Sequence, residues 1–141
     1  MSSGANQAKP RGFNLLTRIV YVHQAFSLAV LGSGLAALLG RGYGLHLLST
    51  AVGLVIAVAT IAAMFGVVKQ KSLRALAWLR VLLWAAGARG LLSVLTLFGT
   101  SDAAIADFVR SMIIHEVILL PIAIYWSRGC NGRYLASLRG S

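Results

Sequence analysis

Four long apolar stretches dominate this sequence, at about residues 19–39, 45–68, 75–98 and 105–126. A helix that crosses a lipid bilayer needs about 20 mainly apolar residues, and each stretch meets that requirement. Backbone polar groups find no water in the bilayer core, so a single spanning segment satisfies them by forming a helix. The sequence therefore predicts an all-α integral membrane fold with four spans.

The composition excludes an ordinary soluble domain. Of the 141 residues, 58% are hydrophobic and only 11% are charged, whereas soluble domains carry charge on roughly a quarter of their residues. We expect a basic tail over residues 1–18, one transmembrane domain over 19–127 and a second basic tail over 128–141. The connections between spans are short, namely "GRGYG" (40–44), "KQKS" (69–72) and "GTSD" (99–102), in which Ser101 or Asp102 can cap the fourth helix. Short connections predict an antiparallel four-helix bundle.

The basic residues gather on one side of the predicted membrane, and the formal net charge is +10. The side that holds both tails and the 69–80 connection contains Lys9, Arg11, Arg18, Lys69, Lys71, Arg74, Arg80, Arg128, Arg133 and Arg139, with no acid. On the other side Arg41 and Arg110 are balanced by Asp102 and Asp107. The positive-inside rule then places both termini in the cytoplasm. Because these charges lie at the ends of apolar runs, we expect anionic lipid headgroups, and no nucleic acid, as their partners.

Two opposite charges, Arg89 and Glu116, lie well inside the third and fourth predicted spans. A lone charge at the bilayer centre costs at least about 2.5–3.5 kcal/mol, so such groups turn inward and pair. Since both residues fall near the middle of their spans, we predict an Arg89–Glu116 ion pair between neighbouring helices. Small and hydroxyl residues on the face of Arg89 are expected to point inward, and leucines on the opposite face toward lipid. The inward set is Ala85, Ser93 and Thr96, and the lipid-facing set is Leu83, Leu91 and Leu95.

The fourth span contains a further irregularity in "IIHEVILLP" (113–121). Pro121 removes a backbone hydrogen bond to Val117 and predicts a kink over 117–121. His115, Glu116 and Arg89 together form a candidate polar or transport site. His23 and Gln24, with Ser27 one turn later, form a polar stripe on the first span that is a second part of this candidate site. Either set can serve only to hold helices in register, and the sequence leaves that alternative open.

Small residues on the first two spans predict close helix packing. The first span carries Gly32, Ala36 and Gly40, and the second carries Ser49, Gly53, Ala57, Thr60 and Met64. Seams of this kind let membrane helices approach closely. We expect the two spans to pack on each other through them; otherwise one seam is free for a second copy of the chain or another membrane subunit.

The histidines do not predict a metal or haem site. With the first span taken to begin near residue 19, His23 and His115 differ in depth by roughly 10 Å, and His46 lies at the opposite membrane boundary. No second metal ligand stands at helical spacing from any of them. We therefore expect no metal and no cofactor.

These patterns predict a small, non-catalytic, multi-pass protein of the bacterial inner membrane that acts as an accessory or interaction subunit. The alternative is a small oligomeric transporter or channel in which His115 and Glu116 handle protons or cations. A membrane redox or lipid-modifying protein is a third, weaker interpretation, in which the region around His23 and Gln24 binds a lipid-like substrate. No catalytic residues are expected under the first interpretation.

Overall fold

The computed structural model describes residues 7–139, and their regular structure is entirely helical. Four long helices run over Phe13–Leu38 (α1), Gly44–Lys69 (α2), Leu73–Leu97 (α3) and Ala103–Ser127 (α4), and a short helix, α5, covers Gly129–Arg139. Each of the four long helices is long and apolar enough to cross a membrane. These are the features of a multi-pass membrane protein, as the apolar runs predict.

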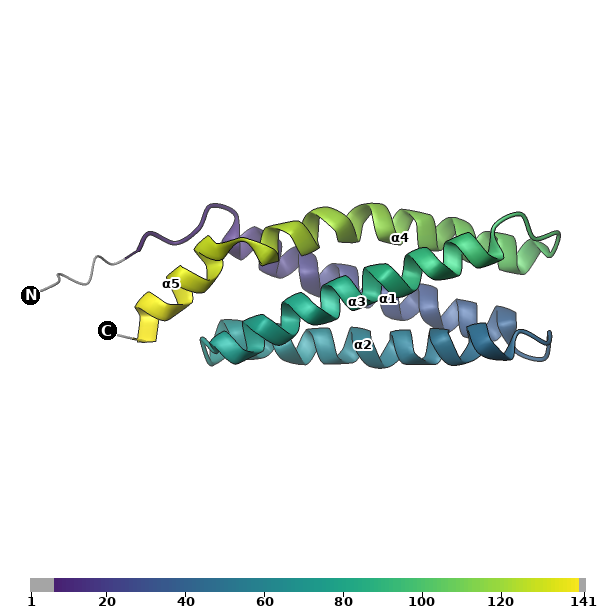
Figure 1. The fold of residues 1–141 in the computed structure, drawn as a ribbon, viewed down its shortest axis with the longest axis horizontal. Coiled ribbons are helices and arrows are strands. Elements are labelled where there is room, and N and C mark those ends of the chain that lie inside the picture. Colours follow the sequence, from purple (N-terminus) through teal and green to yellow (C-terminus); the bar gives the residue numbers. More distant parts are fainter. Residues whose placement is uncertain (1–6, 140–141) are drawn as a thin grey trace, which may run out of the picture.

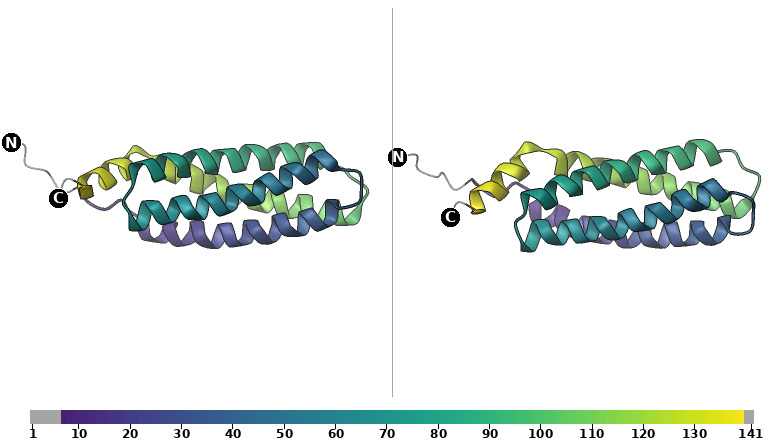
Figure 2. Two further views of the ribbon diagram at one scale, coloured as in Figure 1. Left: turned by 90° about the horizontal axis from the view of Figure 1, so that it is seen from below. Right: turned by 60° about the horizontal axis from the view of Figure 1, so that its bottom comes forward.

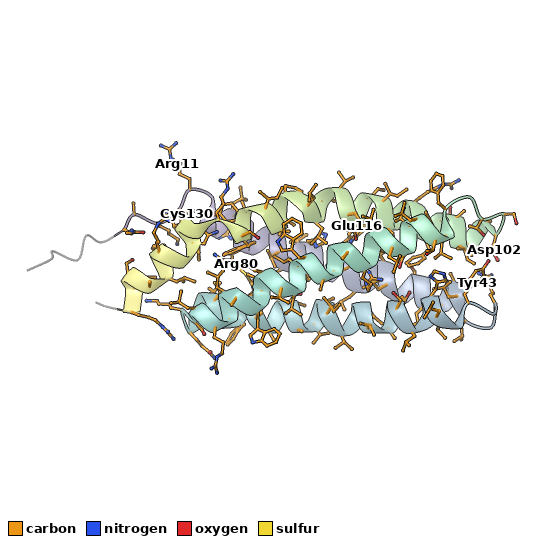
Figure 3. The ribbon with its side chains drawn as sticks, viewed as in Figure 1. Arg11, Tyr43, Arg80, Asp102, Glu116 and Cys130 are labelled. Carbon is orange, nitrogen blue, oxygen red and sulfur yellow. The ribbon has the colours of Figure 1, made fainter. Side chains whose placement is uncertain are left out.

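The four long helices lie side by side as a bundle (Figure 1), in which α1 contacts α2 and α4, and α3 contacts α2 and α4. The start of α1, helix α5 and the α2–α3 connection lie at one end of the bundle, which we call the terminal end (Figure 2). The α1–α2 and α3–α4 connections lie at the other end, which we call the loop end (Figure 1). Tyr43 and Asp102 mark the loop end, and Arg80 and Cys130 lie toward the terminal end (Figure 3).

Local sequence explains where the helices begin and end. The Asp102 carboxylate accepts hydrogen bonds from the backbone N–H groups of Ala104 and Ile105, at 3.0 and 3.3 Å, and so caps α4 as predicted. Ser72 caps α3 by accepting from Ala75 N–H at 3.2 Å. At the loop end, Arg41 Nε lies 3.4 Å from Asp102 Oδ2, so an ion pair joins the two connections.

Helix α5 was not predicted, because the basic C-terminal tail shows no long apolar run. It folds against the terminal end through two buried residues, Asn131 and Leu135. Asn131 Nδ2 donates to the Tyr125 carbonyl at 2.8 Å. Arg80 Nε donates to the carbonyl of Trp126 at 2.9 Å and its Nη2 to that of Arg128 at 3.2 Å, which ties the α4–α5 turn to α3.

The buried apolar side chains form two clusters with a polar layer between them. One cluster, at the terminal end, includes Val20, Met64, Leu83 and Trp126. The other, toward the loop end, includes Leu31, Leu97, Phe108 and Met112. Between these positions along each helix lie the buried polar residues His23, Gln24, Ser27, Thr60, Ser93 and His115. Apart from Thr50 toward the loop end and Asn131 at the terminal end, the described residues therefore carry their buried polar groups at mid-length.

Two predicted helix faces need correction. On α3, Leu83 is only 1% exposed and belongs to the core, while Ala85 and Thr96 are exposed. The core face of α3 runs through Leu79, Leu83, Gly90, Ser93 and Leu97 instead, because apolar burial at both ends outweighs the small residues beside Arg89. Leu91 and Leu95 are exposed, as predicted.

The small-residue seams divide between the inside and the outside of the bundle. On α2, Gly53, Ala57, Thr60 and Met64 are buried as predicted, although Thr50 rather than Ser49 continues the buried row. The predicted packing of Gly32, Ala36 and Gly40 against α2 is wrong, because all three are exposed and Gly40 lies beyond the end of α1. Gly34 is the buried glycine of α1, and it leaves room for the ring of Phe108.

Candidate functional site: a buried histidine–glutamate cluster

Part of the polar layer, together with Arg89 and Glu116, forms a cluster of side chains from three helices. Helix α1 contributes His23, Gln24 and Ser27, α4 contributes His115 and Glu116, and α3 contributes Arg89. His23, Gln24, Ser27 and His115 are each 2–3% exposed. Glu116 lies near mid-length between α3 and α4 (Figure 3). Apart from Ser27, all of these residues are the predicted site residues.

His115 stands at the centre of the cluster, and both of its ring nitrogens have partners. Its Nε2 lies 2.6 Å from Ser27 Oγ, and its Nδ1 lies 3.0 Å from Glu116 Oε1. Ser27 Oγ also lies 2.9 Å from the His23 carbonyl oxygen. A serine has one hydroxyl hydrogen. If that hydrogen goes to the carbonyl, Ser27 accepts from His115 Nε2, which then carries a hydrogen. If it goes to Nε2 instead, the ring hydrogen lies on Nδ1 and is donated to Glu116.

Both arrangements place a hydrogen between His115 Nδ1 and Glu116 Oε1. An ionised carboxylate only accepts hydrogen bonds, and a neutral imidazole donates from one nitrogen and accepts at the other. The contact between Nδ1 and Oε1 therefore requires a hydrogen on one of these two atoms. With Ser27 donating to Nε2, the pair is neutral imidazole with carboxylate; with Ser27 accepting from Nε2, it is imidazolium with carboxylate or imidazole with carboxylic acid. The last two states differ only by moving a proton across a 3.0 Å contact.

His23 packs directly on His115, with the ring centroids 4.4 Å apart. Its Nε2 lies 3.3 Å from the His115 carbonyl, which can only accept, and its Nδ1 lies 3.3 Å from the amide nitrogen of Gln24, which can only donate. His23 is therefore held as the neutral tautomer with its hydrogen on Nε2.

The predicted 10 Å difference in depth between His23 and His115 is wrong. Helix α1 begins at Phe13 rather than near residue 19. Counted from the terminal end, His23 comes ten residues after the start of α1, and His115 comes twelve residues before the end of α4. At 1.5 Å per residue these depths agree to about 3 Å. The two imidazoles nevertheless direct their Nε2 atoms to different partners, not toward a common metal position, and the described residues contain no group of three metal-binding side chains.

The predicted ion pair between Arg89 and Glu116 is not formed among the described residues, where Glu116 contacts His115 instead. The buried Nε and Nη1 of Arg89 have no hydrogen-bond partner. The guanidinium lies against α2, and a Cβ atom added to Gly53 would sit 2.8 Å from its Cζ and Nε. The physical reason is rotation about α3. Gly90, not Arg89, faces the carboxylate, and a side chain at Gly90 would overlap Glu116 Oε1.

Two apolar grooves on the surface of the bundle reach this cluster from opposite sides of α4. The α3–α4 groove encloses about 330 Å³ and is lined by Trp84, Gly87, Leu91, Glu116 and Leu120, among others. The α1–α4 groove encloses about 480 Å³ and is lined by Arg18, Ile19, Val22, His23, Phe26, Ile114 and Ile118. Glu116 therefore borders one groove and His23 the other, and His115 contacts both residues.

Pro121 lies inside α4, which continues past it to Ser127. The kink over 117–121 stays a prediction.

Gly53, Gly87 and Gly90 are the site residues that sequence reasoning missed in this role, since they provide space for Arg89 and Glu116. The available signal was position: each glycine lies at the predicted depth of a buried charge, on a neighbouring helix.

Comparisons of the chain with protein-family models, with curated proteins and with solved structures find no match.

Proposed function

We propose that this chain is a small transporter or channel that handles protons at the His115–Glu116 pair. The observation that carries the proposal is the 3.0 Å contact between His115 Nδ1 and Glu116 Oε1, on a ring whose Nε2 contacts the Ser27 hydroxyl. Histidine is the side chain whose ordinary pKa lies closest to neutral pH. A histidine bonded to a carboxylate inside a bundle can therefore accept and release a proton with little movement of the protein.

The energetics of the bilayer support a role beyond helix packing. Ionisable groups inside membrane spans are costly and generally mark ion pathways or proton relays. A helix interface is held as well by small and apolar residues, and the α2 seam of this chain is of that type. The contacts from His23 to His115 to Glu116 further provide a continuous row of titratable groups between the two grooves.

The proposal includes a topology and a location. It takes the chain as an antiparallel four-helix bundle in the bacterial inner membrane, with both termini in the cytoplasm. The support is the excess of lysine and arginine at the terminal end. Under this orientation the basic terminal end faces the anionic headgroups of the inner leaflet, which act as its lipid partners.

Proton flux into liposomes tests the proposal. Purified protein is reconstituted into liposomes that contain a pH-sensitive dye, and a membrane potential is imposed with potassium and valinomycin. Wild type is expected to acidify the lumen faster than protein-free liposomes, and Glu116→Gln, which keeps the shape but removes the titratable group, is expected to return the rate to background. Asp107→Asn is the matched control, because its side chain is 73% exposed at the loop end. Wild-type flux at background, or full flux in Glu116→Gln, would contradict the proposal.

A second candidate function is the accessory subunit, and one observation favours it. Gly32 and Ala36 form an exposed row on α1, which Gly40 continues just beyond the end of the helix. Among the described residues, apart from the adjoining backbone, nothing lies within 4 Å of a Cβ added at Gly32 or Gly40. Such rows let another membrane helix approach closely. Gly32→Cys in a Cys130→Ser background tests this in native membranes: crosslinking to a different membrane protein supports an accessory role, and crosslinking only to itself supports an oligomeric transporter.

A further inference from the structure

A pocket of about 450 Å³ lies at the terminal end between α1, α2 and α5, and its wall is rich in positive charge. Its lining includes three basic side chains from three different segments, Lys9, Arg18 and Lys71, together with the polar side chains of Asn14, Thr17 and Tyr134. Basic residues that are far apart in the sequence thus converge on one hollow. Helix α5, which the sequence did not predict, closes it with Tyr134, Leu135 and Leu138.

The charge of this pocket is not balanced by the chain. The protein has only three acidic residues, and these lie at the loop end (Asp102 and Asp107) or in the middle layer (Glu116). Among the described residues, none of Lys9, Arg18 and Lys71 makes an ion pair with an acid. Anions with several acceptor oxygens, above all phosphates, are the ligands that converging lysine and arginine side chains bind best.

The wall of the pocket is held in place by aromatic contacts. Phe13 packs edge-on against Tyr134 of α5 and Trp126 of α4, with both centroid distances at 5.3 Å. Lys9 Nζ lies 5.4 Å from the centroid of the same Phe13 ring, within the range of a cation–π contact. Lys71 adopts a left-handed backbone conformation with φ of 50°, which is uncommon for a residue with a side chain. A glycine would adopt this conformation more easily, but it would not carry a charge into the pocket.

The ligand of this pocket also needs an apolar part, because Arg18 lines a second hollow. The same side chain borders the α1–α4 groove, which continues along Ile19, Val22, Phe26, Ile114 and Ile118 toward the middle of the bundle. A polar pocket at the end of the spans thus adjoins an apolar groove along them. This combination matches an amphiphile whose charged group lies at the membrane surface and whose chain enters the hydrocarbon region.

We propose that this pocket binds the phosphate of an anionic phospholipid through Lys9, Arg18 and Lys71, with one acyl chain in the α1–α4 groove. The site does not depend on proton handling. Specific binding at this site differs from the general attraction of a basic surface to a negative membrane. Only Lys9, Arg18 and Lys71 contact the phosphate, and neighbouring basic residues of equal charge do not.

Lipid binding by variants of equal charge tests this. Retention of phosphatidylglycerol is measured by native mass spectrometry for wild type, for Arg18→Gln/Lys71→Gln and for Arg74→Gln/Arg133→Gln, which removes two exposed charges from the same end outside the pocket. The pocket pair is expected to weaken binding about 30-fold, at about fivefold per charge. The control pair is expected to stay within about twofold of wild type, because neither Arg74 nor Arg133 lines the pocket. Equal losses in the two pairs would overturn the proposal.

Two further ligands separate the possible sources of the phosphate. Phosphatidylcholine, which carries the same phosphate without net charge, is expected to bind about tenfold more weakly, and equal binding would overturn the preference for an anionic lipid. Glycerol phosphate lacks acyl chains and is expected to leave wild type unbound at the lipid concentration. If it binds as well as the lipid, the ligand is a water-soluble phosphate and the lipid proposal is wrong.

Lysine labelling of wild type keeps the test independent of any folding defect. An amine-reactive reagent is applied in vesicles of phosphatidylcholine with or without phosphatidylglycerol, and modification is measured by peptide mass spectrometry. Phosphatidylglycerol is expected to protect Lys71 but not Lys69, which lies two residues away and does not line the pocket. Equal protection of both lysines would indicate surface attraction only and would overturn the specific site.

Discussion

The α1–α4 and α2–α3 interfaces hold the bundle together in different ways. Between α1 and α4, Ser27 contacts the ring of His115, and His23 both stacks on that ring and contacts its backbone carbonyl. Between α2 and α3, Arg89 enters beside Gly53, and its buried Nε and Nη1 have no hydrogen-bond partner. One interface therefore satisfies its polar groups, and the other leaves a buried guanidinium partly unsatisfied.

This difference shows that burial alone does not identify a working polar site. Arg89 and His115 both lie at the depth of the polar layer. Both ring nitrogens of His115 have hydrogen-bond partners, whereas the buried Nε and Nη1 of Arg89 have none among the described residues. Proton transfer at a side chain needs neighbouring groups that can donate or accept a proton. The α1–α4 interface, extended by Glu116, supplies them, and the α2–α3 interface does not.

His115→Leu is expected to have the largest effect on this comparison. It removes the contacts to Ser27 and Glu116 together and leaves a buried hydroxyl and a half-buried carboxylate with fewer partners, which should lower the free energy of unfolding by about 2–4 kcal/mol. Unfolding in mixed detergent, followed by circular dichroism, measures it. His46→Leu at the loop end is the matched control and should cost less than about 1 kcal/mol. Equal losses of unfolding free energy in the two variants would mean that His115 in the polar layer stabilises the protein no more than His46 at the loop end.

The sequence predicted the fold well, because a bilayer makes length and hydropathy nearly sufficient to define a spanning helix. It predicted the site residues His23, Gln24, His115, Glu116 and Arg89 but not their pairing. Placing the start of α1 near residue 19 excluded Phe13–Arg18, a turn and a half whose polar residues hide the helix. That helical start is stabilised by the packing of Phe13 on Trp126 and Tyr134, a tertiary contact that local sequence cannot show.

The ion pair between Arg89 and Glu116 stays a prediction. The two side chains interact electrostatically, but they make no direct contact among the described residues. Neighbouring residues on a helix point about 100° apart, so a charge at the correct depth can still face the wrong neighbour. Arg89 turns toward Gly53, and Gly90, the next residue, turns toward Glu116. Which of the two faces α4 is decided by the core row from Leu79 to Leu97 as a whole, and a single polar residue does not override it.

Gly90→Ala is expected to have the second largest effect. The new Cβ would overlap the Glu116 carboxylate, so the carboxylate must move away from His115. We expect a loss of about 1–3 kcal/mol in the free energy of unfolding, with proton flux at background. Gly32→Ala is the control, since its Cβ would meet open space. A Gly90→Ala protein with wild-type stability and flux would show that the contact between His115 and Glu116 is not required.

Ser27→Ala is expected to have a smaller effect that is confined to the α1–α4 interface. It removes the hydrogen-bond partner of His115 Nε2, and hydrogen bonds between membrane helices are worth about 0.6–1.7 kcal/mol. Ser33→Ala is matched in chemistry, because Ser33 Oγ donates only to the carbonyl of Val30 in its own helix. Unfolding of both variants in mixed detergent, followed by circular dichroism, measures the difference in their free energies of unfolding. If Ser33→Ala destabilises as much as Ser27→Ala, the loss comes from helix propensity and not from the contact with His115.

Arg89→Leu is expected to have the smallest effect, and its sign decides how the α2–α3 interface works. Replacing a buried charge that lacks hydrogen-bond partners by an apolar residue is often neutral or stabilising, so we expect the free energy of unfolding to stay within about 1 kcal/mol of wild type or to rise. A loss of 3 kcal/mol or more would instead mean that Arg89 pairs with Glu116 in the membrane, as the sequence pattern suggests.

Adding Glu116→Leu to Arg89→Leu then distinguishes the two cases. In a true ion pair the double variant recovers stability relative to Arg89→Leu alone, whereas independent residues give additive changes. This cycle measures directly whether the two buried charges, matched in depth and opposite in sign, act on each other or through different neighbours.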